Sequence, residues 1–417
     1  MTTVRPFRGL RPVTELAAKI ASLPYDVMDT EEARSKIAAD PYSFLTVTKS
    51  EAALAEGTDV YSDAVYEKAR ENLVNYVKSG KMKQDKTPCF YIYRQRMNQH
   101  IQIGLVAAAS VEEYRNGTIK RHELTRTEKE QDRVRHITET KAQTGPVFLT
   151  YKQRPEISSY ILKLMAEREP VINFIAEDGV RNTLYVVDSP LEIQEIVRLF
   201  KAVPAFYIAD GHHRCAGAMR VADAYAQQKG EKDLSAEYEY FQAVMFPDNM
   251  TEILAYNRVV TDLAGAGEEG FLQAVEEKFT VRPVRKAYHP EARHTFGMYL
   301  DGRWYELKAK PGTFDPEDSI ASLDVSVLQD NLLTPVLKIG DPRTDKRIGF
   351  VGGIRGLEEL ERKVDSGKFA VAFSMYPTLM QEVMTVADMG KIMPPKSTWF
   401  EPKLRDGMVV HLLEDLQ

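Results

Sequence analysis

Cysteine is nearly absent from this 417-residue chain, which carries only Cys89 and Cys215. Two cysteines so far apart exclude a disulfide framework and predict a reducing, cytoplasmic environment. No run of about 18 apolar residues occurs, so no transmembrane helix is expected. The first residues, which include Arg5 and Arg8, lack the apolar core of a signal peptide.

The chain also has no excess of basic over acidic residues. The formal net charge is −6, which argues against a dedicated nucleic-acid-binding protein. No internal repeat or low-complexity segment stands out. Apolar residues make up 43% and charged residues 28% of the chain, as is typical of soluble globular proteins. The length allows a large core and predicts two domains.

The most informative stretch that is present runs from Phe206 to Met219. Its first four residues are apolar and predict a short strand, and apolar spacing from about His213 predicts a helix. Gly211 lies in the turn between them, where it lets the backbone turn tightly or approach a ligand. The N-terminus of the helix and the guanidinium of Arg214 both suit phosphate.

The polar residues of this turn allow two interpretations. Asp210 could hold Mg²⁺ or take a proton, and His212 and His213 could donate or shuttle protons. Alternatively, Asp210 only caps the helix and the two histidines are only neighbours in a turn. The pattern is not a zinc signature, because adjacent histidines cannot easily share one tetrahedral site. We favour a functional turn, since loops after strands commonly carry function.

The segment 119–141 is the most charged part of the chain, with seven Lys or Arg and five Asp or Glu. Such a run is often a solvated helix face. However, His122, Glu123 and Thr125 lie before the periodic part, in an expected loop, where His122 and Thr125 are expected to bind the substrate. Asp132 and Arg133 follow on one face of a predicted helix, where they could bind an amino acid or phosphates.

Two further segments contribute candidates. Asp26 follows a proline-containing extended stretch, as a possible catalytic carboxylate or a plain turn residue. Lys396, Ser397 and Thr398 follow two prolines in a stiff loop that could close over a phosphate, or could be only a loop.

Strands and helices alternate up to about residue 260, which predicts a mixed α/β domain. Residues 265–270 are glycine-rich and form the best linker signal. We therefore predict an α/β (mixed α+β) protein with domains 1–262 and 271–417. The pattern also predicts a strand over Pro41–Thr48.

Several motifs spread over the whole chain resemble those of the DUF1015 family. The DGHHR turn, which follows a predicted strand, resembles a sequence motif of ParB/sulfiredoxin-like proteins. The resemblance implies a ParB/sulfiredoxin-like N-terminal core followed by a second α/β domain. Free-serine kinases of that fold share the DGHHR turn. The motifs are Arg5–Arg8 (RPFR), Pro24–Val27 (PYDV), His122–Thr125 (HELT), Asp132–Arg133, Asp210–Arg214 (DGHHR) and Met393–Thr398 (MPPKST).

The favoured function is therefore a small-molecule kinase that phosphorylates free L-serine with ATP or ADP and Mg²⁺. Gly211, His213 and Arg214 are expected to hold the phosphates together with Lys396–Thr398. Either Asp26 or Glu123 is the expected base. The alternatives are a nucleotide-binding regulator of the ParB-like type and a phosphohydrolase. A homodimer is also plausible.

Overall fold

The computed structural model describes residues 2–416 and divides into two compact units. The first unit comprises residues 2–251 together with 402–416, and the second comprises residues 252–401. This division differs from the predicted domains 1–262 and 271–417 at both ends. Residues 252–260 already belong to strands of the second unit, and the chain returns to the first unit after Glu401.

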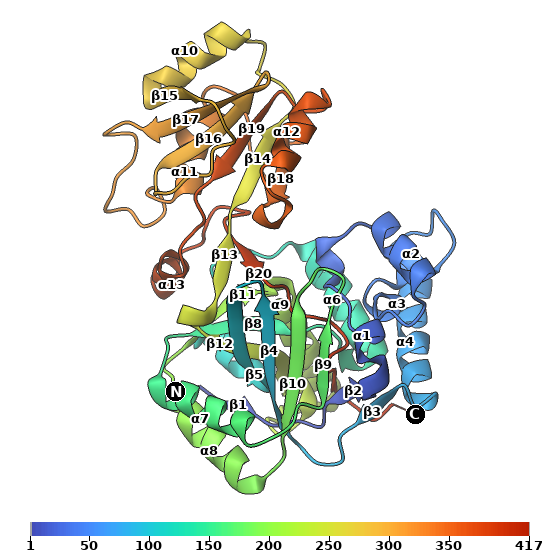
Figure 1. Cartoon of the computed structure of the whole chain (residues 1–417). Helices are drawn as coiled ribbons and strands as arrows, with labels where there is room; N and C mark the ends of the chain where they lie inside the picture. Colours follow the sequence, from blue (N-terminus) through green and yellow to red (C-terminus); the bar gives the residue numbers. More distant parts are fainter. Residues whose placement is uncertain (1, 417) are drawn as a thin grey trace. The chain divides into compact units, whose positions relative to one another are not determined.

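A nine-stranded mixed sheet forms the centre of the first unit (Figure 1). Its strand order is β6-β11-β8-β12-β5-β4-β10-β9, and β1 pairs with β5. Two pairs, β6 with β11 and β8 with β12, are parallel, and the other pairs are antiparallel. The strands are β1 Val4–Arg5, β4 Phe90–Met97, β5 His100–Ser110, β6 Ile119–Lys120, β8 Val147–Tyr151, β9 Ile172–Ile175, β10 Arg181–Val187, β11 Phe206–Asp210 and β12 Tyr240–Pro247.

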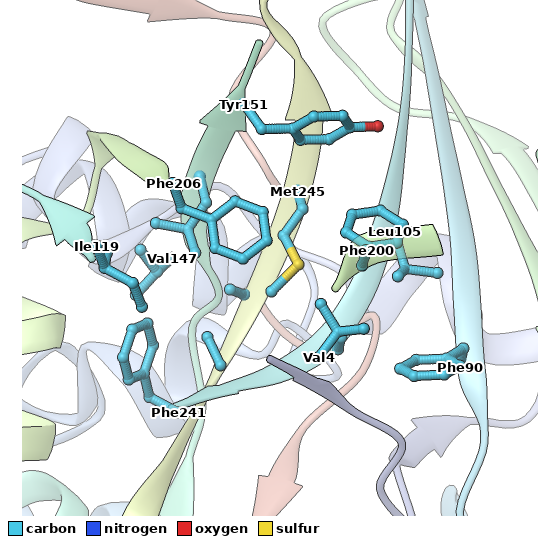
Figure 2. Packing of buried hydrophobic residues seen from close by; sticks show 14 of the residues in the cluster. Val4, Phe90, Leu105, Ile119, Val147, Tyr151, Phe200, Phe206, Phe241 and Met245 are labelled. Atoms are coloured by element: carbon cyan, nitrogen blue, oxygen red, sulfur yellow. The ribbon is translucent and has the colours of Figure 1, made fainter. Parts of the chain in front are cut away.

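Apolar side chains from one face of this sheet form the main core (Figure 2). Side chains alternate along a strand, so Phe90 and Ile92 of β4 face this core together. The amphipathic helices α7, α8 and α9 bury their apolar stripes in the same core. The helices of this unit are α1 Ala17–Ile20, α2 Thr30–Ala39, α3 Leu45–Thr48, α4 Asp63–Lys78, α5 Val111–Arg115, α6 Thr127–Thr140, α7 Pro155–Ala166, α8 Pro190–Phe200 and α9 His212–Lys229.

The last residues of the chain lie against buried polar side chains of the same sheet. Gln95 and Gln102 donate hydrogen bonds to the carbonyls of Lys403 and Pro402 at 3.0 and 3.3 Å. Gln242 donates to the carbonyl of Val409 at 2.7 Å. Two short ladders complete the unit: β2 (Leu10–Pro12) with β3 (Met82–Gln84), and β7 (Ala142–Gln143) with β21 (His411–Leu412). These hydrogen bonds hold the C-terminal segment in the first unit.

Phe206 tests this core directly, because its ring is fully buried among the side chains shown in Figure 2. We expect Phe206→Ala to lower the free energy of unfolding by about 3–5 kcal/mol, since it removes buried apolar surface and leaves a cavity. Leu191→Ala is the matched control on an exposed helix position and should stay within about 0.5 kcal/mol of wild type. Chemical denaturation followed by circular dichroism measures both. A loss below about 1 kcal/mol for Phe206→Ala would show that this ring is not packed as described.

One predicted strand is wrong. Residues 41–48 contain the helix α3, with Leu45, Val47 and Thr48 buried. The segment looks like a strand because it contains β-branched and aromatic residues, but its apolar side chains pack on helix α4 and on the C-terminal segment. Tertiary packing overrides the local preference here.

The second unit contains a six-stranded antiparallel sheet of order β15-β17-β16-β19-β14-β18. A separate pair, β13 with β20, joins its two chain ends. Its strands are β13 Glu252–Leu254, β14 Tyr256–Val260, β15 Phe279–Val284, β16 Thr295–Leu300, β17 Arg303–Ala309, β18 Ile348–Gly352, β19 Val371–Met375 and β20 Trp399–Glu401. Its helices are α10 Glu268–Lys278, α11 Asp324–Leu328, α12 Glu358–Asp365 and α13 Met380–Asp388, and a π-helical turn covers Gln329–Leu333.

Helices and sheets together confirm the predicted mixed α+β class. The finer prediction of a ParB/sulfiredoxin-like core stays a prediction. Within residues 2–416, no helix has the length and apolar character needed to cross a membrane.

Candidate functional site

The strand, turn and helix expected around Gly211 are present. Strand β11 ends at Asp210, and helix α9 begins at His212. Gly211 lies between them with φ +100°, a conformation that favours glycine. Gly211 itself is the N-cap residue, so Asp210 does not cap the helix. The turn therefore presents the first N–H groups of α9 beyond the end of a buried strand.

Arg214 lies on the first turn of α9 and is buried. Its Nη1 donates to the carbonyl of Pro146, and its Nη2 lies 3.4 Å from Oδ2 of Asp26. Burial would lower the pKa of the guanidinium, but the carboxylates of Asp26, Asp210 and Asp406 raise it above its ordinary value. Arg214 is thus a permanently charged group at the helix N-terminus, with the half-exposed carboxylate of Asp26 beside it.

Asp210 is held by a lysine from the C-terminal segment. Nζ of Lys403 donates to Oδ2 of Asp210 at 3.0 Å. Burial would raise the pKa of Asp210, but Lys403 and Arg214 outweigh burial and hold that pKa well below its ordinary value. Asp210 is therefore an ionised carboxylate with one oxygen already engaged.

The buried pair of histidines is His122 with His212. Their rings meet edge to face, with centroids 4.6 Å apart and planes at 89°. Burial lowers the pKa of His122 to about 4 and the pKa of His212 well below 6.5, so both rings are neutral near pH 7. Neither ring nitrogen of His212, nor Nδ1 of His122, has a hydrogen-bond partner among residues 2–416.

His213 and Thr125 take different places from this pair. The Nε2 atom of half-buried His213 accepts a hydrogen bond from the backbone N–H of Arg126 at 3.1 Å. Thr125 donates its hydroxyl hydrogen to Glu130 on helix α6. The first interaction attaches the loop before α6 to the start of α9, which brings the HELT and DGHHR segments together, and the second attaches the same loop to α6.

Helix α6 supplies a second arginine. The guanidinium of Arg133 donates to Oδ2 of Asp132 at 2.7 Å and lies over the ring of Tyr25, 3.9 Å from its centroid. Oδ1 of Asp132 accepts from the hydroxyl of Tyr66 at 3.0 Å. Helices α6 and α9 approach closely because Gly217 faces Arg133, where an added Cβ would lie 2.9 Å from the arginine Cβ. The guanidinium of Arg214 also lies over the ring of Tyr25, 5.9 Å from its centroid.

A small pocket opens between these elements, and its enclosed space has room for about one water molecule. The pocket is lined in part by the carboxylate of Asp406, a residue that no sequence motif indicated. Asp406 is almost fully buried, and within the described chain neither of its oxygens has a hydrogen-bond partner. The lining residues are Tyr25, Thr48, Arg133, His136, Ile137, Gln143, Thr144, Gly145, Arg214 and Asp406.

Asp406 gives the protein a testable pH dependence. Burial raises the pKa of this carboxyl from 3.8 to about 7, although Arg214 opposes the shift. The folded protein therefore binds the proton more tightly, so this group's contribution to stability is fully present below about pH 4 and is lost as pH rises through about 7. Between pH 4 and pH 8, Asp406 should lower the free energy of unfolding of wild type by up to roughly 4 kcal/mol. Asp406→Asn should not show this decrease, because its amide does not titrate.

Chemical denaturation of both proteins across that pH range measures the effect. At each pH the free energy of unfolding of wild type is subtracted from that of the variant. The change of this difference with pH reports on Asp406, because the other titrating groups are common to both proteins. A difference that stays constant with pH would show that Asp406 does not titrate as described.

Lys396, Ser397 and Thr398 belong to the second unit, where the contacts of Lys396 and Ser397 are local. The carbonyl of Lys396 accepts from Nη2 of Arg258 at 3.0 Å, and its Nζ lies 5.5 Å from the ring centroid of Tyr256. The hydroxyl of Ser397 donates to the carbonyl of Pro394 at 2.6 Å. Their role in phosphate binding stays a prediction.

The chain matches the family described as a protein of unknown function, DUF1015, over residues 4–326. The chain belongs to this family. The match includes Asp26, the HELT segment and the DGHHR turn, whereas the MPPKST segment lies beyond it. A comparison with curated proteins finds no match.

Several solved structures are similar at low identity. A conserved hypothetical protein from Pyrococcus furiosus is 14% identical with a TM-score of 0.34, covering 74% of this chain and 95% of its own. A free serine kinase in complex with AMP is 14% identical with a TM-score of 0.32, covering 71% and 86%. C-terminally truncated SbnI from Staphylococcus aureus is 11% identical with a TM-score of 0.37, covering 72% and 85%. None of these similarities assigns a function to this chain.

Proposed function

We propose that this protein is a small-molecule kinase that transfers a phosphoryl group from ATP or ADP to the hydroxyl of free L-serine. One observation carries the proposal. Nη2 of Arg214, at the start of α9, lies 3.4 Å from Oδ2 of Asp26. A group that can bind phosphate and a carboxylate that could act as the base would thus lie close together, where each could reach one part of a phosphoryl-transfer site.

The donor phosphates would bind at the turn. Gly211 exposes the backbone there, and the first N–H groups of α9 favour negative charge. Arg214 adds a planar fork that can bind phosphate oxygens bidentately. Half-buried His213 lies at the same turn, and because its Nε2 accepts from Arg126, its Nδ1–H could donate a hydrogen bond to a phosphate oxygen.

The acceptor would bind at the open mouth of the pocket that Tyr25 lines. The pocket offers guanidinium groups from Arg133 and Arg214 and the buried carboxyl of Asp406. Charges of both signs in one small pocket match the carboxylate and ammonium of a zwitterionic amino acid. An ammonium beside Asp406 would also stabilise its ionised form, which burial otherwise disfavours.

The reaction then needs one base. Serine Oγ attacks the terminal phosphorus, its proton passes to Asp26, and the bond from phosphorus to the leaving nucleotide oxygen breaks. The carboxylate of Asp26 is accessible, with 41% of its side chain exposed. Glu123, half-buried beside His122, is the second candidate for the base.

Mg²⁺ is the metal expected with the nucleotide, where it neutralises phosphate charge. Asp26 offers carboxylate oxygens of the kind that this ion prefers. Asp210, the ligand predicted from the sequence, fits less well, because Lys403 already engages its Oδ2.

Nucleotide consumption with and without serine tests the proposal. The full-length protein is incubated with Mg²⁺ and ATP or ADP, and the nucleotide products are separated by chromatography. We expect product nucleotide only when serine is present. Turnover without serine would indicate a phosphohydrolase, and nucleotide binding without any turnover would indicate a regulator. Either result would overturn the kinase proposal.

A further inference from the structure

His122, Glu123 and His212 bring three potential metal ligands to one place. One ligand atom from each residue lies within 4.8 Å of the others. The two imidazoles are in direct edge-to-face contact, with centroids 4.6 Å apart and planes at 89°. His122 and Glu123 come from the loop before α6, whereas His212 is the first residue of α9.

The two rings are buried, yet much of their hydrogen-bonding capacity is unused. His212 is 6% exposed and His122 is 2% exposed. Three of their four nitrogens, both of His212 and Nδ1 of His122, lack a hydrogen-bond partner in the part of the chain that is described. Buried polar atoms are nearly always satisfied, so such a pair calls for a bound group.

The neighbouring histidine behaves differently. Nε2 of His213 is already an acceptor for the N–H of Arg126. The adjacent histidines of the turn therefore do not form a pair. His212 instead pairs with His122, which lies far away in the sequence and close in space.

We propose that His122, Glu123 and His212 bind a divalent first-row transition-metal ion such as Zn²⁺ or Mn²⁺. Neutral imidazole nitrogens and a carboxylate oxygen suit these ions, whereas Mg²⁺ prefers oxygen ligands alone. Metal–ligand bonds of about 2.0–2.2 Å require the three side chains to close slightly around the ion. Three protein ligands leave a further coordination position for water or a substrate oxygen, as in catalytic metal sites.

The metal site does not rest on the proposed kinase activity, although Glu123 is also the second candidate for the base. Its test therefore uses the metal alone, with no nucleotide and no serine. The full-length protein is stripped with a chelator and titrated with Zn²⁺, Mn²⁺ or Mg²⁺ by calorimetry, and bound metal is counted by elemental analysis. We expect one Zn²⁺ or Mn²⁺ per chain and no comparable binding of Mg²⁺.

Variants locate the ion. Changing a residue that only supports a ligand commonly costs about 10- to 100-fold in metal affinity, so we expect His122→Ala and His212→Ala to lose at least about 100-fold. His213→Gln is the matched control and should retain wild-type affinity, because its ring is engaged by Arg126. Glu123→Gln preserves the size of a half-buried side chain and should weaken binding while the protein stays folded.

Co²⁺ substitution adds a readout that does not depend on affinity. Bound Co²⁺ should give visible absorption bands that His212→Ala shifts or abolishes and His213→Gln leaves unchanged. Thermal unfolding of each metal-free variant checks its fold. Absence of stoichiometric Zn²⁺ or Mn²⁺ binding by wild type, or affinity that is unchanged in the His122, His212 and Glu123 variants, would overturn the proposal.

Discussion

Asp26→Asn should lower the rate of phosphoserine formation by roughly 10²–10⁴-fold, because a positioned general base contributes about that much. The amide keeps the size and shape of the side chain but cannot accept the serine proton. It can still accept a hydrogen bond from Arg214, whose Nη2 lies 3.4 Å from the carboxylate. Nucleotide affinity should therefore survive, and the loss should appear in kcat.

Asp188→Asn is the control for this variant, since it removes an exposed carboxylate elsewhere in the same unit. Steady-state kinetics with product detection by mass spectrometry compares the two variants with wild type. Full turnover by Asp26→Asn would remove Asp26 from the mechanism. If Glu123→Gln were then inactive, Glu123 would be required instead, either as the base or as a ligand of the proposed metal ion.

Arg214→Lys should weaken nucleotide binding by about 10- to 150-fold, equivalent to the roughly 1.5–3 kcal/mol of a charge-assisted hydrogen bond. Lysine keeps the charge, but an ammonium cannot reproduce the planar, bidentate fork. Calorimetric titration with ADP and ATP measures the change. Arg181→Lys, an exposed position of the first unit, should leave affinity unchanged.

Arg214 also has a structural role, which the experiment must distinguish from its proposed role in nucleotide binding. Its guanidinium counters the buried charges of Asp210 and Asp406 and donates to the carbonyl of Pro146. The melting temperature of Arg214→Lys should therefore be recorded beside its affinity. A lowered melting temperature with unchanged nucleotide affinity would show that Arg214 only supports the fold.

The local part of the site could be read from the sequence. An apolar strand, one glycine and a periodic helix follow each other within Phe206–Met219, so the turn is determined by neighbouring residues. Its glycine requires a positive φ, and its arginine lies on the first helical turn. No long-range information was needed to place Arg214 beside a helix N-terminus.

The site residues that come together from distant parts of the sequence could not be predicted in this way. Lys403 and Asp406 lie beyond the second unit in the sequence, yet they return to Asp210 and to the pocket. Nothing local distinguishes them from the other charged residues of a C-terminal segment. The same limit hid the pairing of His122 with His212, because the sequence displays His212 beside His213.

Serine labelled with ¹⁸O in its hydroxyl provides the most direct measurement of the central claim. The full-length protein is supplied with this serine, Mg²⁺ and either ATP or ADP, and the products are analysed by mass spectrometry. The account predicts phosphoserine that retains the ¹⁸O label, because the serine oxygen attacks phosphorus. Absence of phosphoserine with both nucleotides, from protein that binds them, would contradict it.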